Sequence, residues 1–254
     1  MLSILIVNWN TRELLRACLT SMSNHPPSEA FEVIVVDNAS TDGSAEMVRE
    51  EEAFGVWRLA FGDQPNAQRP TPNALRLVAS PTNTGYAAGN NLAFAEACGD
   101  FLLTLNPDTE FVDDSLDQAL EILRAHPRVG VLGVRQVSPD GSTQHSVRGF
   151  PSLRGILGDL FKIKAWDSYR LSSFDYDQEQ EAPQPMGTFL LFRREALADV
   201  GDPKKPFDES FPIFFNEVDL LYRLKMKGWG CLYTPKAKIL HHGGESTKLV
   251  RKSM

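Results

Sequence analysis

The sequence predicts an α/β protein with a mainly parallel central sheet flanked by helices. Short runs of large, often β-branched residues alternate with stretches whose apolar residues recur at helical spacing, an order typical of βαβ units. The runs are apolar at nearly every position, which indicates strands buried on both faces of a sheet. With 254 residues and 42% hydrophobic composition, the chain can bury a full core, and we expect one domain over 1–254.

The first half of the chain shows the alternation most clearly. A helix is expected to begin after Thr11, a candidate cap, because its apolar residues recur at helical spacing from Leu14 to Met22. Ser40 and Ser44 are cap candidates for the next helix. The other elements expected in this half are strands at 2–7, 33–36 and 101–105 and helices at 85–97 and near 114–125.

The second half is less regular. Residues 62–76 and 135–185 show little periodicity and are expected to be loops, and long loops inside a domain are often functional. The order then resumes with "MGTFLLFRREAL", a strand followed by a helix. A further helix is expected to end at Gly228, and the strand-like runs "GCLYT" and "AKIL" follow it.

Polar residues stand directly after three of the expected strands. These are Asn8-Trp9-Asn10, Asp37-Asn38 and Asn106-Pro107-Asp108. Because the carboxyl ends of parallel strands meet at one edge of a sheet, ligands bind there. The sequence has neither the glycine pattern of a dinucleotide site nor a P-loop, and its net charge of -7 argues against a nucleic-acid surface. A bound nucleoside diphosphate would therefore need a divalent cation, with Asp108 as the anchoring ligand.

The sequence resembles the inverting glycosyltransferases of family 2, which have the GT-A fold. Seven segments occur in the family's order: "ILIVNWN", "VIVVDNASTDGS", "NTGYAAGNN", "LLTLNPDTE", "GTFLLFRREAL", "FNEVDLLYRLKMKGWG" and "HHGGEST". They span nearly the whole chain. The usual Asp-x-Asp is Asn106-Pro107-Asp108 here, a variant similar to the rhamnosyltransferase-like branch. The resemblance implies a single Rossmann-like GT-A domain, with a nucleotide-binding half at 1–112 and an acceptor-binding and catalytic half at 113–254.

The resemblance also implies a role for individual residues in binding a nucleotide-sugar donor. Val7 and Trp9 would line the base, and Asp37 would accept a hydrogen bond from its N–H edge. The residues expected beside the rest of the donor are Asn83, Gly85, Asn91, Asn106 and Asp108, with Asn106 as a ribose or water-mediated contact.

The same resemblance implies the metal and catalytic residues. Asp108 and a histidine after the last strand would bind Mn²⁺ or Mg²⁺, and His241 matches the family position better than His242. Glu217 matches the catalytic base, and Asp219 would be a secondary acceptor contact. A carboxylate near an acceptor hydroxyl can take its proton as the hydroxyl attacks the sugar. Inversion in one step needs one catalytic carboxylate, whereas hydrolases need two.

Each candidate also has a purely structural interpretation. Asp108 and Asp37 could be turn residues, Glu217 and Asp219 could favour the start of a helix, and His241 could be a polar strand end. Trp9 could belong to the core. The segment "RGFPSLRGILGDLFKIKAW" could cover the sheet or contact a lipid-linked acceptor, and we expect it to cover the sheet.

The predicted function is metal-dependent transfer of a sugar, with L-rhamnose as the candidate, to a glycan or polyprenyl-linked glycan. One alternative is a sugar-nucleotide nucleotidyltransferase, although "VNWNTRELL" lacks the glycine of a triphosphate loop. Another is an inactive sugar-nucleotide or glycan-binding module, because Asn106 and Asn216 replace expected acids.

Composition and chain patterning bear on where the protein acts. Its three scattered cysteines predict neither a disulfide framework nor a metal site. No run is long enough to span a bilayer, and no basic signal-peptide start precedes the first strand. We expect a cytoplasmic protein and leave open peripheral association with the inner face of a membrane.

Overall fold

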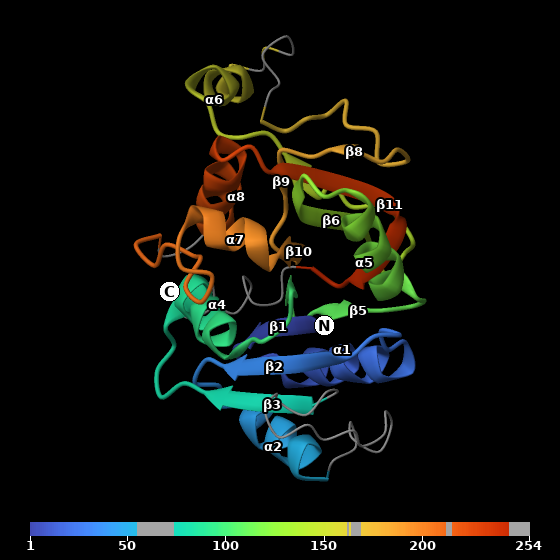
Figure 1. The fold of residues 1–254 in the computed structure, drawn as a ribbon, viewed down its shortest axis with the longest axis vertical. Coiled ribbons are helices and arrows are strands. Elements are labelled where there is room, and N and C mark those ends of the chain that lie inside the picture. Colours follow the sequence, from blue (N-terminus) through green and yellow to red (C-terminus); the bar gives the residue numbers. More distant parts are fainter. Residues whose placement is uncertain (55–73, 162, 164–168, 212–214, 244–254) are drawn as a thin grey trace.

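One large sheet organises the protein. The computed structural model describes residues 1–54, 74–161, 163, 169–211 and 215–243. Within these residues, a nine-stranded sheet has the order β3-β2-β1-β4-β10-β6-β11-β5, with β8 paired to β11 (Figure 1). The sheet joins the two halves of the sequence, and the predicted single α/β architecture is confirmed.

The first half forms a parallel sheet with connecting helices. Its strands are β1 (Leu2–Asn8), β2 (Phe31–Asp37), β3 (Ala74–Ala79) and β4 (Phe101–Leu105), and all of their pairings with one another are parallel. The helices of this half are α1 (Arg12–Asn24), α2 (Ser44–Phe54) and α4 (Gly85–Glu96). Every residue of β2 and β4 is buried, as the continuous apolar runs predicted.

The second half adds mixed pairing. β10 (Phe189–Arg193) lies antiparallel between β4 and β6 (Val129–Val137), and β11 (Gly230–His241) runs parallel to β6. The helices are α5 (Ser115–Ala125), α6 (Leu153–Leu160), α7 (Arg194–Val200) and α8 (Asn216–Met226). The short strands are β5 (Thr109–Glu110), β7 (Val147–Arg148), β8 (Gln180–Glu181) and β9 (Gln184–Pro185).

Two apolar layers hold the helices against the sheet. On one face, buried residues of α1, α2 and α5 such as Leu19, Met47 and Leu120 pack on the strands. On the other face, α4, α7 and α8 pack through residues such as Phe94 and Leu221. Burial of apolar surface on both faces is the main force that fixes the strands, and hence their polar carboxyl ends.

The structure differs from the predicted elements in four places. Residues 135–185, expected to be loops, contain the end of β6, the short strands β7, β8 and β9 and the helix α6. Residues 74–76 belong to β3 instead of a loop, while 62–73 lie outside the described residues. Strand β6 was not predicted, because glycines interrupt its apolar run; at Gly133 an added Cβ would lie 2.6 Å from Pro185. The two predicted strands "GCLYT" and "AKIL" are one strand, β11, whose register shifts between Thr234 and Lys238.

The first N–H of α1 is bonded by a residue other than the predicted cap. Thr11 is the N-cap residue, but its hydroxyl donates to Asn8 Oδ1 at 2.6 Å and makes no capping bond. The N–H of Arg12 instead donates to Asp42 Oδ2 at 2.8 Å. A side chain 30 residues away thus satisfies the helix N-terminus and ties α1 to the loop before α2.

Candidate functional site

Asp108 and His241 meet at the junction of β4, β5 and β11. Antiparallel pairing of β11 with β5 sets His241 opposite Thr109, one residue after Asp108. His241 Nε2 lies 3.5 Å from Asp108 Oδ2, and the two side chains are only 11% and 8% exposed. The last predicted strand therefore brings the predicted histidine to the predicted carboxylate, across 133 positions of sequence.

The donor atoms of this pair fit a divalent cation. Asp108 Oδ1 is buried and has no hydrogen-bond partner, which is costly for a carboxylate oxygen unless a ligand satisfies it. Two atoms 3.5 Å apart can both reach a cation at about 2.1 Å. Across the described part of the chain, no group of three His, Cys, Asp or Glu side chains is placed to hold a metal. A cation here would need further ligands beyond the side chains of Asp108 and His241.

His242 has a separate partner. Its Nε2 lies 2.6 Å from Glu110 Oε1, and its backbone N–H donates to the carbonyl of Asp108 at 3.0 Å. The adjacent histidines thus face two different carboxylates, and His241 is the one that shares a space with Asp108. This arrangement favours the predicted choice of His241.

Glu217 lies in the first turn of α8 and is half-buried. Burial raises the pKa of its carboxyl above the ordinary value. A Cβ added at Gly187 would lie 3.8 Å from the Glu217 carboxyl carbon and 3.2 Å from the Tyr86 hydroxyl. The Tyr86 hydroxyl donates to the carbonyl of Gly187 at 3.1 Å. Tyr86 and Gly187 therefore shape the space beside Glu217.

Asp219 makes a structural contact. Its carboxylate pairs with Arg223 Nε at 2.8 Å, one turn along α8. Arg223 also donates to the carbonyl of Pro206 at 2.6 Å, so the pair anchors the segment after α7. This contact is the structural interpretation left open for Asp219, and its acceptor role stays a prediction.

Asp37 closes a turn at the end of β2. Its Oδ2 accepts the N–H of Ser40 at 3.0 Å, and its Oδ1 accepts from Asn8 Nδ2 at 3.2 Å. Ser40 Oγ in turn accepts the N–H of Asn10 at 2.9 Å. The network binds the ends of β1 and β2 together, so Asp37 has a structural role beside its predicted contact with a base.

Asn38 links β2 to the segment before α4. Its Nδ2 donates to Asn83 Oδ1 at 2.9 Å and to the carbonyl of Gly85 at 3.1 Å. Asn83 Oδ1 also accepts the N–H of Gly85 at 3.0 Å. Gly85 has φ +82, a conformation that favours glycine. The predicted wall residues Asn83 and Gly85 are thus fixed beside the end of β2.

The other predicted donor residues differ in their surroundings. Asn91 is 5% exposed and bonds to both backbone groups of Phe207 and to Glu209, which gives it a structural role. Val7 and Trp9 are half-buried at the end of β1 and after it, and Val7 packs against Gly89, where an added Cβ would lie 2.8 Å away. Asn106 is half-buried and donates its N–H to the carbonyl of Thr188 at 3.0 Å.

Left-handed backbone is concentrated around these residues. Among the described residues, the non-glycine positions with positive φ are Asn10, Ala39, Leu171 and Phe215. Asn10 follows β1, Ala39 follows β2 and Phe215 directly precedes α8. Such conformations cost about 1 kcal/mol or more and persist where surrounding contacts impose them, often at functional sites. Left-handed backbone therefore occurs both at the carboxyl ends of β1 and β2 and directly before α8.

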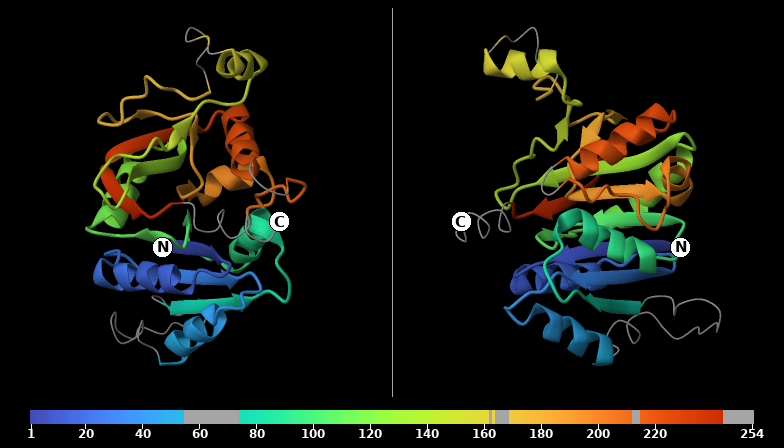
Figure 2. Two further views of the ribbon diagram at one scale, coloured as in Figure 1. Left: turned by 180° about the vertical axis from the view of Figure 1, so that it is seen from behind. Right: turned by 90° about the vertical axis from the view of Figure 1, so that its left-hand side faces the viewer.

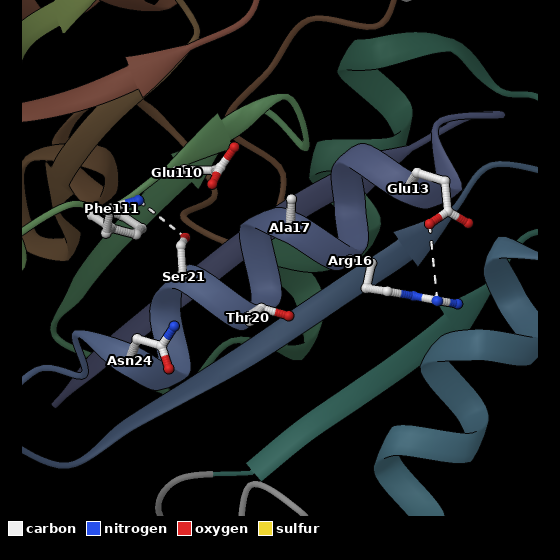
Figure 3. Close-up of a pocket in the computed structure, with 8 residues that line it drawn as sticks. All are labelled: Glu13, Arg16, Ala17, Thr20, Ser21, Asn24, Glu110 and Phe111. Carbon is white, nitrogen blue, oxygen red and sulfur yellow. Dashed lines mark hydrogen bonds and ion pairs between the residues drawn. The ribbon is translucent and has the colours of Figure 1, made fainter. Parts of the chain in front are cut away.

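A groove of about 450 Å³ lies beside this site (Figure 3). Side chains of α1 form one wall, and Glu110 and Phe111 form the other. None of its lining residues is a predicted donor, metal or catalytic residue. The groove adjoins the site through Glu110, the partner of His242. The functional site is therefore identified by the arrangement of its side chains and not by the position of this groove.

Three residues that shape the site were not predicted from the sequence. Tyr86 and Gly187 lie within quoted segments but carry no charge or metal-ligand signal, and only the fold brings them to Glu217. Gln144 lies in a region expected to be irregular, yet its side chain contacts His241 at two points. No sequence pattern pairs a glutamine with a histidine 97 positions later.

Comparison with known proteins gives matches over most of the chain. The profile of Glycosyl transferase family 2 matches residues 3–201. The N-acetylglucosaminyl-diphospho-decaprenol L-rhamnosyltransferase of Mycobacterium tuberculosis is 31% identical over 252 residues, covering 92% of this chain and 73% of that protein. The O-antigen biosynthesis protein RfbC of Myxococcus xanthus is 27% identical, covering 97% of this chain and 18% of that protein.

Solved structures match the fold. The mannosyltransferase PcManGT from Pyrobaculum calidifontis, in complex with GDP-Man and Mn²⁺, has a TM-score of 0.63 at 19% identity, covering 96% of this chain and 57% of that one. S. aureus TarS 1–349 in complex with UDP has a TM-score of 0.59 at 17% identity, covering 94% of this chain and 59% of that one. This chain thus spans somewhat more than half of these two chains. The predicted GT-A fold is confirmed.

Proposed function

Because the chain belongs to glycosyl transferase family 2 and is a glycosyltransferase, we propose that it transfers L-rhamnose, with inversion, from a nucleoside diphosphate to a lipid-linked glycan. The sugar and the acceptor rest on the rhamnosyltransferase that is 31% identical over 92% of this chain. That enzyme's name specifies an acceptor with a sugar on a polyprenyl diphosphate. The family match favours sugar transfer over nucleotidyl transfer and over an inactive module.

We assign the two halves of the chain to the two substrates. Residues 1–112 hold the predicted donor contacts at the ends of β1, β2 and β4, and 113–254 hold Glu217 and His241. Val7, Trp9, Asp37, Asn83 and Gly85 remain the donor contacts that we propose. The first three lie at or directly after the ends of β1 and β2. Asn83 and Gly85 are held beside the end of β2 by the side chain of Asn38.

Asp108 and His241 are the proposed ligands of Mn²⁺ or Mg²⁺. The observation that carries this part is that Asp108 has one buried oxygen, Oδ1, without a hydrogen-bond partner, while its other oxygen, Oδ2, lies 3.5 Å from His241 Nε2. When bound, such a cation supplies positive charge that stabilises a departing diphosphate. Solved GT-A relatives crystallised with Mn²⁺ support a divalent cation.

Glu217 is the proposed general base. As the acceptor oxygen bonds to the anomeric carbon, the bond from that carbon to the diphosphate breaks, and its electron pair leaves with the nucleotide. The acceptor proton passes to Glu217. Burial raises the pKa of this carboxyl, which makes its anion a stronger base. One displacement from the opposite face inverts the anomeric configuration.

Donor and acceptor screens test the proposed function. With Mn²⁺ present, L-rhamnose activated on uridine, thymidine or guanosine diphosphate should raise the melting temperature more than other sugars on the same base, because a bound ligand stabilises the folded state. Labelled rhamnose should then pass to a polyprenyl-diphospho-N-acetylglucosamine and not to the free sugar. Transfer of a different sugar to that acceptor would refute the rhamnose assignment but retain the enzyme class.

We also propose that α6 docks on an anionic bilayer surface. Its segment was expected to cover the sheet, but Leu153, Leu160 and Phe161 are 75%, 69% and 66% exposed. The helix stands out from the body (Figures 1 and 2). It is attached through Phe150, whose ring contacts Tyr222 of α8.

Charge supports a membrane as the partner of this surface. Residues 148–164 contain four basic residues (Arg148, Arg154, Lys162 and Lys164) and one acidic residue, Asp159, in a chain of net charge -7. Exposed apolar side chains combined with positive charge are typical of helices that lie in a bilayer interface. No helix among the described residues is long and apolar enough to cross a membrane. Docking at the inner face of a membrane would bring a cytoplasmic enzyme to a lipid-linked acceptor.

The double substitution Leu160→Asp and Phe161→Asp tests this surface. We expect it to abolish co-sedimentation with vesicles that contain anionic lipid, while Leu92→Asp, at a 39% exposed position of α4, should leave it unchanged. Salt should weaken binding of the wild type because its basic residues are screened. Co-sedimentation of the double variant at wild-type levels would remove α6 as the docking element.

A further inference from the structure

Gln144 holds His241 at two points. It lies after β6, where its own N–H donates to the carbonyl of Gln136 at 2.8 Å. Its side-chain Nε2 donates to the carbonyl of His241 at 2.8 Å, and its Oε1 lies 2.7 Å from His241 Nδ1. The second N–H of the amide points to Ser138 Oγ at 3.1 Å. Every polar atom of the Gln144 side chain therefore has a partner.

These contacts determine which way the amide faces. The carbonyl of His241 can only accept, so it must face the NH₂ group of Gln144. The amide oxygen consequently faces His241 Nδ1. Because that oxygen can only accept, Nδ1 must carry the hydrogen. In the neutral imidazole, the other nitrogen then has a lone pair and no proton.

The nitrogen left unprotonated is the one that faces Asp108. His241 Nε2 lies 3.5 Å from Asp108 Oδ2, and both side chains are almost fully enclosed. A histidine can ligate a cation through a nitrogen only if that nitrogen is unprotonated. Without an acceptor at Nδ1, the imidazole could place its hydrogen on Nε2, where Asp108 would accept it and close the site.

We propose that Gln144 is a positioning residue that fixes the tautomer of His241 and keeps its Nε2 available for a divalent cation. This inference rests on the proposed metal role of Asp108 and His241. Outer hydrogen-bond partners of this kind typically contribute about 10- to 100-fold to metal affinity. The side chain of Gln144 contacts Ser138 and His241, so its effect on the site should pass through the imidazole.

A merely structural role for Gln144 makes a different prediction. If the side chain only ties the loop after β6 to β11, the important bond is its donation to the carbonyl of His241. Gln144→Glu removes that donation but keeps an acceptor for Nδ1–H. Gln144→Leu removes both with little change of volume. The two variants therefore separate the acceptor role from the tether.

Two measurements at one pH near 8 test the proposal. Long-range ¹⁵N–¹H spectra of the imidazoles report which nitrogen carries the hydrogen, and a His241→Asn variant identifies the signals of His241 among the five histidines. Electron paramagnetic resonance of free Mn²⁺ gives the cation affinity without any substrate. Wild type and Gln144→Glu should show Nδ1–H and similar Mn²⁺ affinity, while Gln144→Leu should show the Nε2–H form and lose at least about tenfold in affinity.

Other outcomes would overturn the inference. Equal losses in Gln144→Glu and Gln144→Leu would identify a tether, and an Nε2–H tautomer in the wild type would contradict the assigned amide orientation. Thermal melts check that both variants fold. If wild-type protein bound no Mn²⁺ although the tautomers followed the expected order, the proposed metal role would fail and the orienting role of Gln144 would stand.

Discussion

Replacing Glu217 by Gln is expected to lower the turnover of sugar transfer at least about a hundredfold and to leave donor binding intact. The amide keeps the size of the side chain but cannot take the acceptor proton. Glu217 lies in the first turn of α8 beside Gly187 and Tyr86, and the metal-site residues are on other elements. Steady-state turnover and calorimetric donor affinity measure the two effects separately.

The raised pKa of Glu217 predicts how activity and stability depend on pH. Activity of the wild type should fall as the pH drops through this pKa, and the midpoint should lie above the ordinary glutamate value of about 4.3. In the folded state, burial opposes ionisation, so the charged carboxylate costs stability at neutral pH. Glu217→Gln should therefore be more stable than wild type at pH 7–8. The difference should shrink as the pH falls below about 4, where most of the glutamate is protonated in both states.

Glu195→Gln is the matched control. Glu195 is an exposed acid in the first turn of α7, so its substitution removes the same charge from a helix start without touching the site. It should change neither turnover nor the acidic limb of the pH profile. Full turnover in Glu217→Gln would exclude Glu217 as the base, and an equal loss in Glu195→Gln would show a general effect of charge.

The sequence predicted those site residues whose positions depend on the residue type and on the order of the strands. Asp37, Asp108 and Glu217 stand at strand ends or a helix start, so their positions follow once the strands are known. The pairing of Asp108 with His241 followed only from the family resemblance. Its physical cause is the antiparallel register of β5 and β11, which a single sequence does not encode as a visible pattern.

The errors in the predicted fold arise where tertiary contacts override local pattern. Strand β6 has glycines because Pro185 and neighbouring side chains occupy the space of a Cβ, and those glycines hide its periodicity. Thr11 has the residue type of a cap, yet Asp42 supplies the acceptor for the helix N–H. The exposed residues of α6 were expected to cover the sheet because apolar composition alone does not indicate which surface it faces.

In a sequence, polar side chains that stabilise the fold cannot be distinguished from polar side chains that bind a ligand. Asn91 bonds to Phe207 and Glu209, and Asp219 pairs with Arg223, although both were predicted from ligand-binding segments. Conversely, Gln144 gave no signal, because its importance lies in the orientation of one amide. Such distinctions depend on atomic distances and appear only in three dimensions.

Replacing Asp108 by Asn is expected to abolish the part of donor affinity that depends on a divalent cation. The amide keeps the shape but removes the negative charge and one oxygen ligand, so Mn²⁺ should no longer strengthen nucleotide binding by more than a few-fold. Calorimetric titration of a nucleoside diphosphate with and without Mn²⁺ measures this increment directly. Affinity without the cation should match wild type, because the base contacts proposed above lie at the ends of β1 and β2.

A thermal melt of Asp108→Asn and a control substitution at the neighbouring Glu110 complete the test of Asp108. Its Oδ1 is buried without a hydrogen-bond partner, so Asp108→Asn should not lower the melting temperature of the metal-free protein. Glu110→Gln is the control, since Glu110 lies two residues away and pairs with His242. If Asp108→Asn kept the Mn²⁺ increment and Glu110→Gln lost it, the cation would belong to the Glu110–His242 pair. If both variants kept the Mn²⁺ increment, the cation would bind elsewhere than at β5. Asp108 and Glu110 are the carboxylates that lie next to His241 and His242.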